Sequence, residues 1–89
     1  MSKLGLYVKF TTQAGQRDAL AALLLDAAQA AADVAGCELY IVNTSPTEPD
    51  VIWVTEIWSS PEAHQESLTW DTTKAIIAQG RPLIAGIER

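Results

Sequence analysis

Alternation of apolar and polar residues predicts three β-strands in the first two thirds of the chain. In residues 4–10 every second side chain is apolar, and glycine, tyrosine and lysine occupy the positions between, as in a half-buried strand. Cys37–Thr44 and Val51–Trp58 are rich in the β-branched and aromatic residues that favour strands. Residues 45–50 are polar or turn-forming and include two prolines, so the last two strands are expected to form a hairpin.

Helical spacing replaces this alternation in residues 17–35. Apolar residues recur there at intervals of three and four, which predicts a helix with one apolar stripe. Gly36 is expected to end the helix, because glycine adopts a left-handed backbone at little cost. The predicted stripe consists of Leu20, Leu23, Leu24, Ala27, Ala28 and Ala31.

A second helical region is predicted to begin directly after the third strand. Ser60 is a good N-cap, and Pro61 suits the first helical position, where its missing N–H is not needed. A further helical piece is expected over residues 71–79, capped by Asp71 and closed by Gly80.

A short final strand is predicted over residues 82–87, which completes the order β-α-β-β-α-β. This order predicts one α+β domain over residues 1–89, with a ferredoxin-like antiparallel sheet and its helices on one face. Val51–Trp58 carries apolar side chains on both faces, so the other face of the sheet needs a cover as well. We therefore expect a homodimer that associates through the sheet faces.

Composition excludes several classes of partner. The net charge is −5 and no basic cluster is present, so neither nucleic acid nor an anionic membrane surface is an expected partner. No apolar run approaches the ~20 residues that a membrane span needs, and the N-terminus does not resemble a signal peptide. The sequence contains one cysteine, Cys37, which cannot form an intrachain disulfide or a cysteine-based metal site. A cytoplasmic protein without a metal is expected.

The segment with the most candidate chemistry runs from residue 55 to residue 68. It places Glu56, Trp58 and His64, the one histidine of the chain, at the end of a strand and the start of a helix. Imidazole titrates near neutral pH and suits a general base, although a surface histidine is a common alternative. Trp58 could stack on a flat ligand or anchor the core, and Glu56 on the same face should be paired, near solvent or functional.

The chain resembles the antibiotic biosynthesis monooxygenase-like domains, a dimeric α+β barrel superfamily that includes quinol monooxygenases. The resemblance implies oxidation of an electron-rich phenol or hydroquinone by O2 without a metal, flavin or haem. It extends over nearly the whole chain and rests on the ordered combination of Ala14-Gly15-Gln16, Gly36-Cys37, Tyr40, Glu56-x-Trp58, Glu62-Ala63-His64, Ser67-Leu68 and Arg81-Pro82-Leu83.

Two positions depart from the family pattern. Some members carry an asparagine where this chain has Val54, and many carry a histidine where it has Ser67. His64 lies three residues before Ser67, so both fall on one helical face. Haem-degrading members place a histidine ligand where this chain has residues 75–77, which are alanine and isoleucine, so haem degradation is disfavoured.

Together the residues and the resemblance define a set of candidate site residues. His64 and Trp58 are the catalytic candidates, with His64 accepting a phenolic proton and Trp58 stacking on the substrate. No cofactor is expected. The candidates for substrate binding are Tyr7, Tyr40, Val54, Ser67 and Arg81.

Two other functions stay open. One is a non-catalytic dimeric module that binds a hydrophobic aromatic metabolite. The other is an isomerase of a small phosphorylated diketone, a role known in the same superfamily, for which six scattered lysines and arginines offer little phosphate binding.

Overall fold

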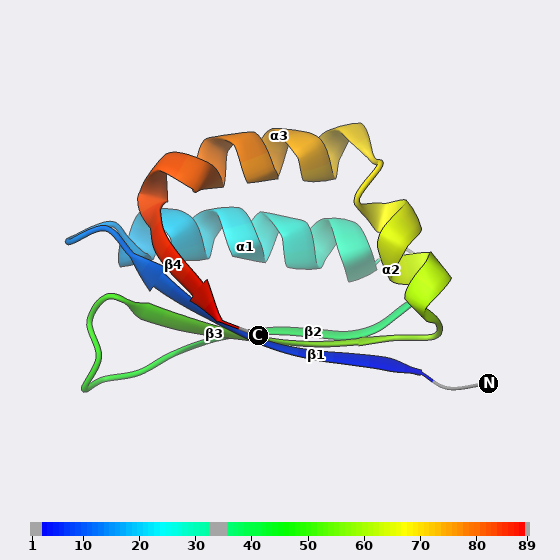
Figure 1. Cartoon of the computed structure of the whole chain (residues 1–89), viewed down its shortest axis with the longest axis horizontal. Coiled ribbons are helices and arrows are strands. Elements are labelled where there is room, and N and C mark those ends of the chain that lie inside the picture. Colours follow the sequence, from blue (N-terminus) through cyan, green and yellow to red (C-terminus); the bar gives the residue numbers. More distant parts are fainter. Residues whose placement is uncertain (1–2, 33–35, 89) are drawn as a thin grey trace.

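A computed structural model describes residues 3–32 and 36–88 of the chain (Figure 1). The elements follow the predicted order, with the two predicted helical pieces after the third strand and an additional 3-10 turn before the last strand. They are β1 (Leu4–Thr12), α1 (Arg17–Ala32), β2 (Cys37–Thr44), β3 (Val51–Trp58), α2 (Pro61–Ser67), α3 (Asp71–Gly80), η1 (Arg81–Leu83) and β4 (Ile84–Glu88).

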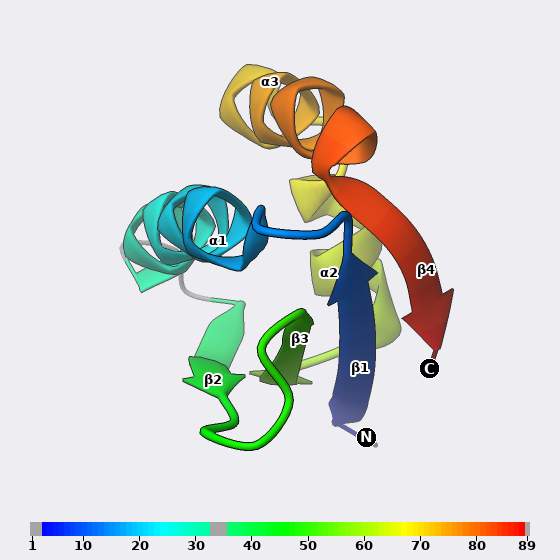
Figure 2. The same ribbon diagram turned by 90° about the vertical axis from the view of Figure 1, so that its left-hand side faces the viewer.

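The strands form one antiparallel sheet in the order β2-β3-β1-β4. All three helices lie on the same side of this sheet, with α1 and α3 side by side (Figures 1 and 2). Viewed end-on, β4 connects the end of α3 to the edge of the sheet beside β1 (Figure 2). This is the predicted ferredoxin-like α+β arrangement.

The core forms where the apolar stripe of α1 meets the helix-facing side of β3. Leu20 and Leu24 pack on Ile52 and Val54, and all four side chains are buried. Trp58 continues the same face of β3 and is 2% exposed, whereas Trp53 lies on the opposite face. The predicted division of β3 between two environments is therefore confirmed.

Sequence prediction misplaced several element ends. β1 continues to Thr12, beyond the predicted residues 4–10, because Thr11 and Thr12 pair with β4. The predicted end of the first helix at residues 33–35 lies outside the described residues.

The end of the chain needs the largest correction. Trp70, and not Asp71, occupies the N-cap of α3, without a side-chain hydrogen bond to the helix. Gly80 is the last residue of α3 with a right-handed φ of −78°, so it does not end the helix by a left-handed turn. The chain continues into η1, where Pro82 is tolerated in the first turn, and β4 begins at Ile84.

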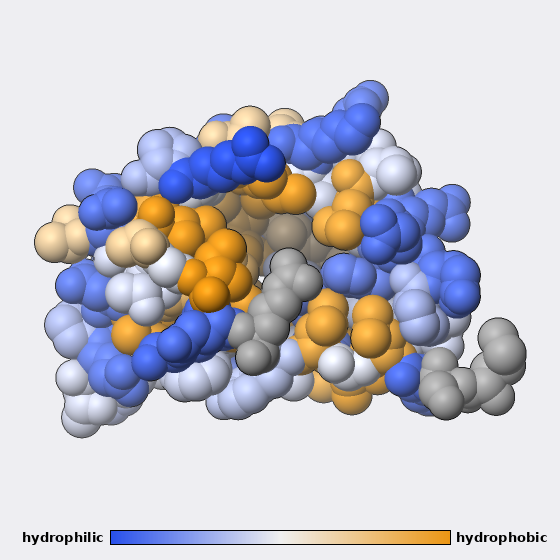
Figure 3. Space-filling model, in the orientation of Figure 1, coloured by the Kyte–Doolittle hydropathy of each residue, from blue (hydrophilic) through white to orange (hydrophobic). Residues whose placement is uncertain are grey.

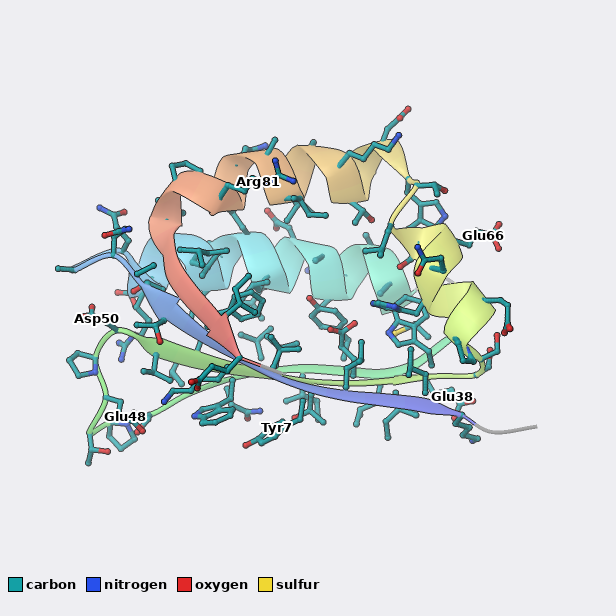
Figure 4. All side chains as sticks on the ribbon, in the orientation of Figure 1. Tyr7, Glu38, Glu48, Asp50, Glu66 and Arg81 are labelled. Carbon is teal, nitrogen blue, oxygen red and sulfur yellow. The ribbon has the colours of Figure 1, made fainter. Side chains whose placement is uncertain are left out.

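The face of the sheet opposite the helices carries its own aromatic cluster. Tyr7 stacks on Trp53 with ring centroids 4.8 Å apart, and the Lys9 ammonium lies 5.6 Å from the Trp53 ring. Tyr7 points away from the helices (Figure 4) and is 59% exposed, and Ile41, two strands away on the same face, is 43% exposed. We call this surface the outer sheet face.

Among the described residues, no helix combines the length and the apolar composition that crossing a membrane requires.

Candidate functional site

A cavity of about 620 Å³ lies between the helix-facing side of the sheet and the three helices. Its size falls in the range of small-molecule sites, and Figure 3 shows the hollow opening on one face with apolar side chains around it. Apolar residues from β1, α1, α3 and β4 supply much of the wall. They include Leu4, Leu6, Val8, Phe10, Leu24, Ala27, Ala31, Ile76, Ile77, Ile84 and Ile87.

Trp58 and Glu56 form the polar part of the wall that β3 contributes. They lie two residues apart on the same face of the strand, and both line the cavity. The Trp58 indole Nε1 donates a hydrogen bond to Glu56 Oε1 at 3.0 Å. This bond satisfies the polar atom of the buried indole and holds the carboxylate against the wall.

The start of α2 positions His64 at the same wall. Ser60 caps the helix by accepting a hydrogen bond from the Ala63 N–H at 3.2 Å, and Pro61 follows it at the first helical position, as predicted. One turn later the His64 ring meets Trp58 nearly edge-on, with centroids 5.4 Å apart and an interplanar angle of 66°. The imidazole and the indole therefore share one cavity.

Tyr40 faces the cavity from β2, directly across the strand pair from Glu56. Burial, and after it the negative charge of Glu56, raises the pKa of Tyr40. Its phenol is therefore neutral at physiological pH and keeps a proton to donate. The same two causes raise the pKa of the Cys37 thiol, which is therefore a poor nucleophile.

Ser67 and Arg81, two further predicted substrate-binding residues, also line the cavity, one buried and the other exposed. Ser67 is buried, but its hydroxyl donates to the His64 carbonyl oxygen at 2.6 Å, so its proton is already used within α2. Arg81 is exposed and begins η1 after α3 (Figure 4). Its guanidinium can meet a ligand only at the rim of the cavity.

The structure does not place Tyr7 and Val54, two predicted substrate-binding residues, at this cavity. Tyr7 belongs to the outer sheet face, separated from the cavity by the sheet. Val54 is 1% exposed and packed beneath α1, outside the set of cavity-lining residues. Strand alternation could have excluded Tyr7, because apolar neighbours in β1 mark the opposite face as the buried one.

Sequence reasoning missed the contribution of the segment around α3. Trp70 lines the cavity with Thr73, Ile76 and Ile77. The spacing of three and four from Thr73 to Ile77 was the available signal. Glu56, expected to be paired, near solvent or functional, accepts the indole hydrogen bond.

Within residues 3–32 and 36–88, no three histidine, cysteine or acidic side chains come together as a metal site would require. The polar groups of the cavity are suited to binding and proton transfer: an imidazole, a carboxylate, a neutral phenol and an indole.

Fold and cavity together define a ferredoxin-like α+β domain with a mainly apolar cavity. The family model described as antibiotic biosynthesis monooxygenase (ABM) matches residues 4–79. The chain therefore belongs to the ABM family.

Solved structures agree with this assignment. A protein of Chloroflexus aurantiacus, described provisionally as an antibiotic biosynthesis monooxygenase, is 44% identical with a TM-score of 0.89, over 99% of this chain and 87% of that one. A Caulobacter crescentus protein with the same provisional description is 30% identical with a TM-score of 0.84, over 97% and 85% of the two chains. PA3566 from Pseudomonas aeruginosa shares the fold, with a TM-score of 0.90 at 17% identity, over 99% and 89%. No protein in the curated set matches this chain.

Proposed function

We propose that this protein is a monooxygenase that oxidises an electron-rich phenol or hydroquinone with O2 inside the cavity, without a cofactor. The observation that carries the proposal is the shared cavity of His64 and Trp58, about 620 Å³ in volume and mainly apolar in its walls. Membership of the ABM family supports the same class of reaction.

The reaction balances with the substrate as the electron donor. One oxygen atom of O2 enters the product and the other leaves as water, and all four electrons come from the substrate. A hydroquinone would thus become a hydroxyquinone. An anionic substrate gives up electrons to O2 more readily than a neutral one, so the protein must first remove a proton.

His64 and Tyr40 divide the proton chemistry in this proposal. His64 accepts the phenolic proton, and the edge-on contact with Trp58 holds the imidazole at the cavity wall. Tyr40 keeps its proton because its pKa is raised, so it can donate a hydrogen bond to the negative oxygen that forms. Trp58 supplies a flat apolar surface, and the aliphatic walls limit access of water to the anion.

Oxygen consumption by purified protein with a panel of hydroquinones tests this function. We expect one O2 consumed per product molecule and one labelled oxygen atom in the product when isotopically labelled O2 is used. His64→Gln should lower turnover by about a hundredfold or more, the usual contribution of a general base. Glu66→Gln, two residues after His64 in α2, is the matched control and should retain wild-type turnover, because Glu66 is exposed and is not among the cavity-lining residues. Unchanged turnover in His64→Gln would remove the assigned base.

Absence of oxygen consumption alongside tight ligand binding would favour the non-catalytic module. The phosphorylated-diketone isomerase has less support, because Arg81 is the one lysine or arginine among the described cavity-lining residues and it is exposed.

The homodimer and the cytoplasmic location belong to this proposal as well. An exposed apolar cluster on the outer sheet face supports self-association through that face.

A further inference from the structure

Glu56 is a carboxylate on an otherwise largely apolar wall. Its neighbours across the strand pairs are Leu6 and Tyr40, and its side chain is half-buried. Removing a charged carboxylate from water costs free energy unless hydrogen bonds replace the lost hydration. The position of Glu56 therefore calls for partners.

The protein supplies one such partner. Glu56 Oε1 accepts the Trp58 indole hydrogen bond. The ion pairs among the described residues are Lys3–Glu38, Lys9–Glu88 and Arg17–Asp18, none of which involves Glu56. Within the same described part of the chain, no hydrogen bond uses Glu56 Oε2. One oxygen of a carboxylate held in place at the cavity wall thus remains able to accept a hydrogen bond from a ligand.

We propose that Glu56 binds the ligand by accepting a hydrogen bond from its phenolic hydroxyl, and that this contact selects uncharged O–H donors over anions. The inference rests on the proposed function, from which it takes the aromatic class of the ligand. It adds that Glu56 orients the ligand and that the bound ligand is uncharged. A hydroquinone has two hydroxyl groups, so one can bind Glu56 while the other gives its proton to His64.

The charges around the cavity favour this selectivity. Apart from His64, the described cavity-lining residues include one basic side chain, that of Arg81. Arg81 is exposed at the rim. A ligand carboxylate or phosphate inside the cavity would approach the Glu56 carboxylate without a nearby fixed cation to offset the repulsion. A neutral hydroxyl instead gains a charge-assisted hydrogen bond, which is stronger than one between neutral groups.

A binding experiment with three related probes tests the inference without relying on turnover. 1-Naphthol carries the donor, 1-methylnaphthalene replaces the hydroxyl by a methyl group of similar size, and 1-naphthoate is an anion. Isothermal titration of the wild-type protein at neutral pH should show naphthol binding at least about tenfold more tightly than either other probe, as expected for a hydrogen bond to a charged group.

Glu56→Gln should change the order of the probes. The glutamine side-chain carbonyl can still accept the Trp58 hydrogen bond, so the variant keeps the wall but loses the charge. We expect the preference for naphthol over methylnaphthalene to fall to about twofold or less, and naphthoate binding to improve. Glu62→Gln is the matched control, because Glu62 is exposed in α2 outside the cavity, and it should keep the wild-type order.

Three results would overturn the inference: a wild-type protein that binds naphthol and methylnaphthalene equally, a folded Glu56→Gln variant that keeps the wild-type order, or a wild-type protein that binds none of the probes. The wild-type measurement decides even if the variant fails to fold. Failure of the proposed oxygenase reaction is read separately, from oxygen consumption, and leaves the binding preference intact.

Discussion

Tyr40 shows how a single residue takes its chemistry from its surroundings. Its place in β2 follows from strand propensity, but its raised pKa comes from burial and from Glu56 on the neighbouring strand. A tyrosine in an unfolded chain ionises at about pH 10. The folded protein should hold the Tyr40 proton beyond that pH.

This difference predicts a loss of stability in alkali. Above about pH 10 the unfolded state releases the Tyr40 proton while the folded state retains it. The free energy of unfolding therefore falls as the pH rises above this value, whereas below it the Tyr40 contribution to stability is fully present. Chemical denaturation across an alkaline pH series should show the fall, and Tyr40→Phe should reduce it. In a Tyr7→Phe background, phenolate absorbance reports Tyr40 alone, and ionisation of the folded protein near pH 10 would contradict the assignment.

At the residue scale, the sequence identified His64, Trp58, Tyr40, Ser67 and Arg81, all of which line the cavity. It could not show that Ser67 has already used its proton or that Arg81 lies at the rim, because both depend on contacts and exposure set by the fold. Glu56 was recognised as unusual from alternation, and its partner became visible only in three dimensions.

At the element scale, the position of α2 depends on a close approach to the start of β2. A side chain added at Gly36 would place its Cβ only 2.7 Å from the Ala63 Cβ, closer than real Cβ atoms come. Ala63 directly precedes His64, so this contact also helps to set where the imidazole lies.

Gly36→Ala is therefore expected to destabilise the fold by about 1–3 kcal/mol, the usual cost of overpacking. Denaturant unfolding measures the effect. Adding Ala63→Gly should recover part of the loss, because it removes the clashing carbon, although glycine inside a helix itself costs roughly 1 kcal/mol.

Gly86→Ala is the matched control, since a Cβ at Gly86 would lie 4.0 Å from the Thr11 Cβ, an ordinary contact distance. Equal stabilities of Gly36→Ala and Gly86→Ala would contradict the packing role of Gly36.

The element boundaries show which local signals can be trusted. β2 and β3 begin and end where the sequence predicts, because alternation and the proline-containing loop are local features. The region from Trp70 to Ile84 was predicted less well. Asp71 and Gly80 are typical cap residues, but neither acts as predicted, since α3 passes directly into η1 before β4 joins β1.

At the scale of the whole molecule, the two faces of the sheet have different roles. One face carries the core and the cavity, while the outer sheet face leaves Tyr7 and Ile41 exposed around Trp53. Ile41 and Tyr7 flank Thr55 in the same row across the sheet, which makes this row the middle of the proposed dimer contact.

Ile41→Lys should therefore weaken dimerisation by at least about tenfold, because a buried unpaired charge is costly at an interface. Sedimentation equilibrium measures the change. Leu25→Lys is the control, because Leu25 is an exposed leucine on α1, away from the outer sheet face, and the dimer should survive it. A monomeric wild-type protein, or equal effects of the two substitutions, would contradict this interface.

The sequence by itself determined the α+β order, the antiparallel hairpin and the division of β3 into two faces, because strand and helix periodicities are properties of neighbouring residues. Only the tertiary structure decided that a cavity remains between sheet and helices, and that Glu56, Trp58 and His64 meet at its wall. Tertiary structure also excluded Tyr7 and Val54 from that cavity. The physical reason is that a cavity depends on distances between segments far apart in the chain, whereas a periodic pattern records only which side of its own element a residue occupies.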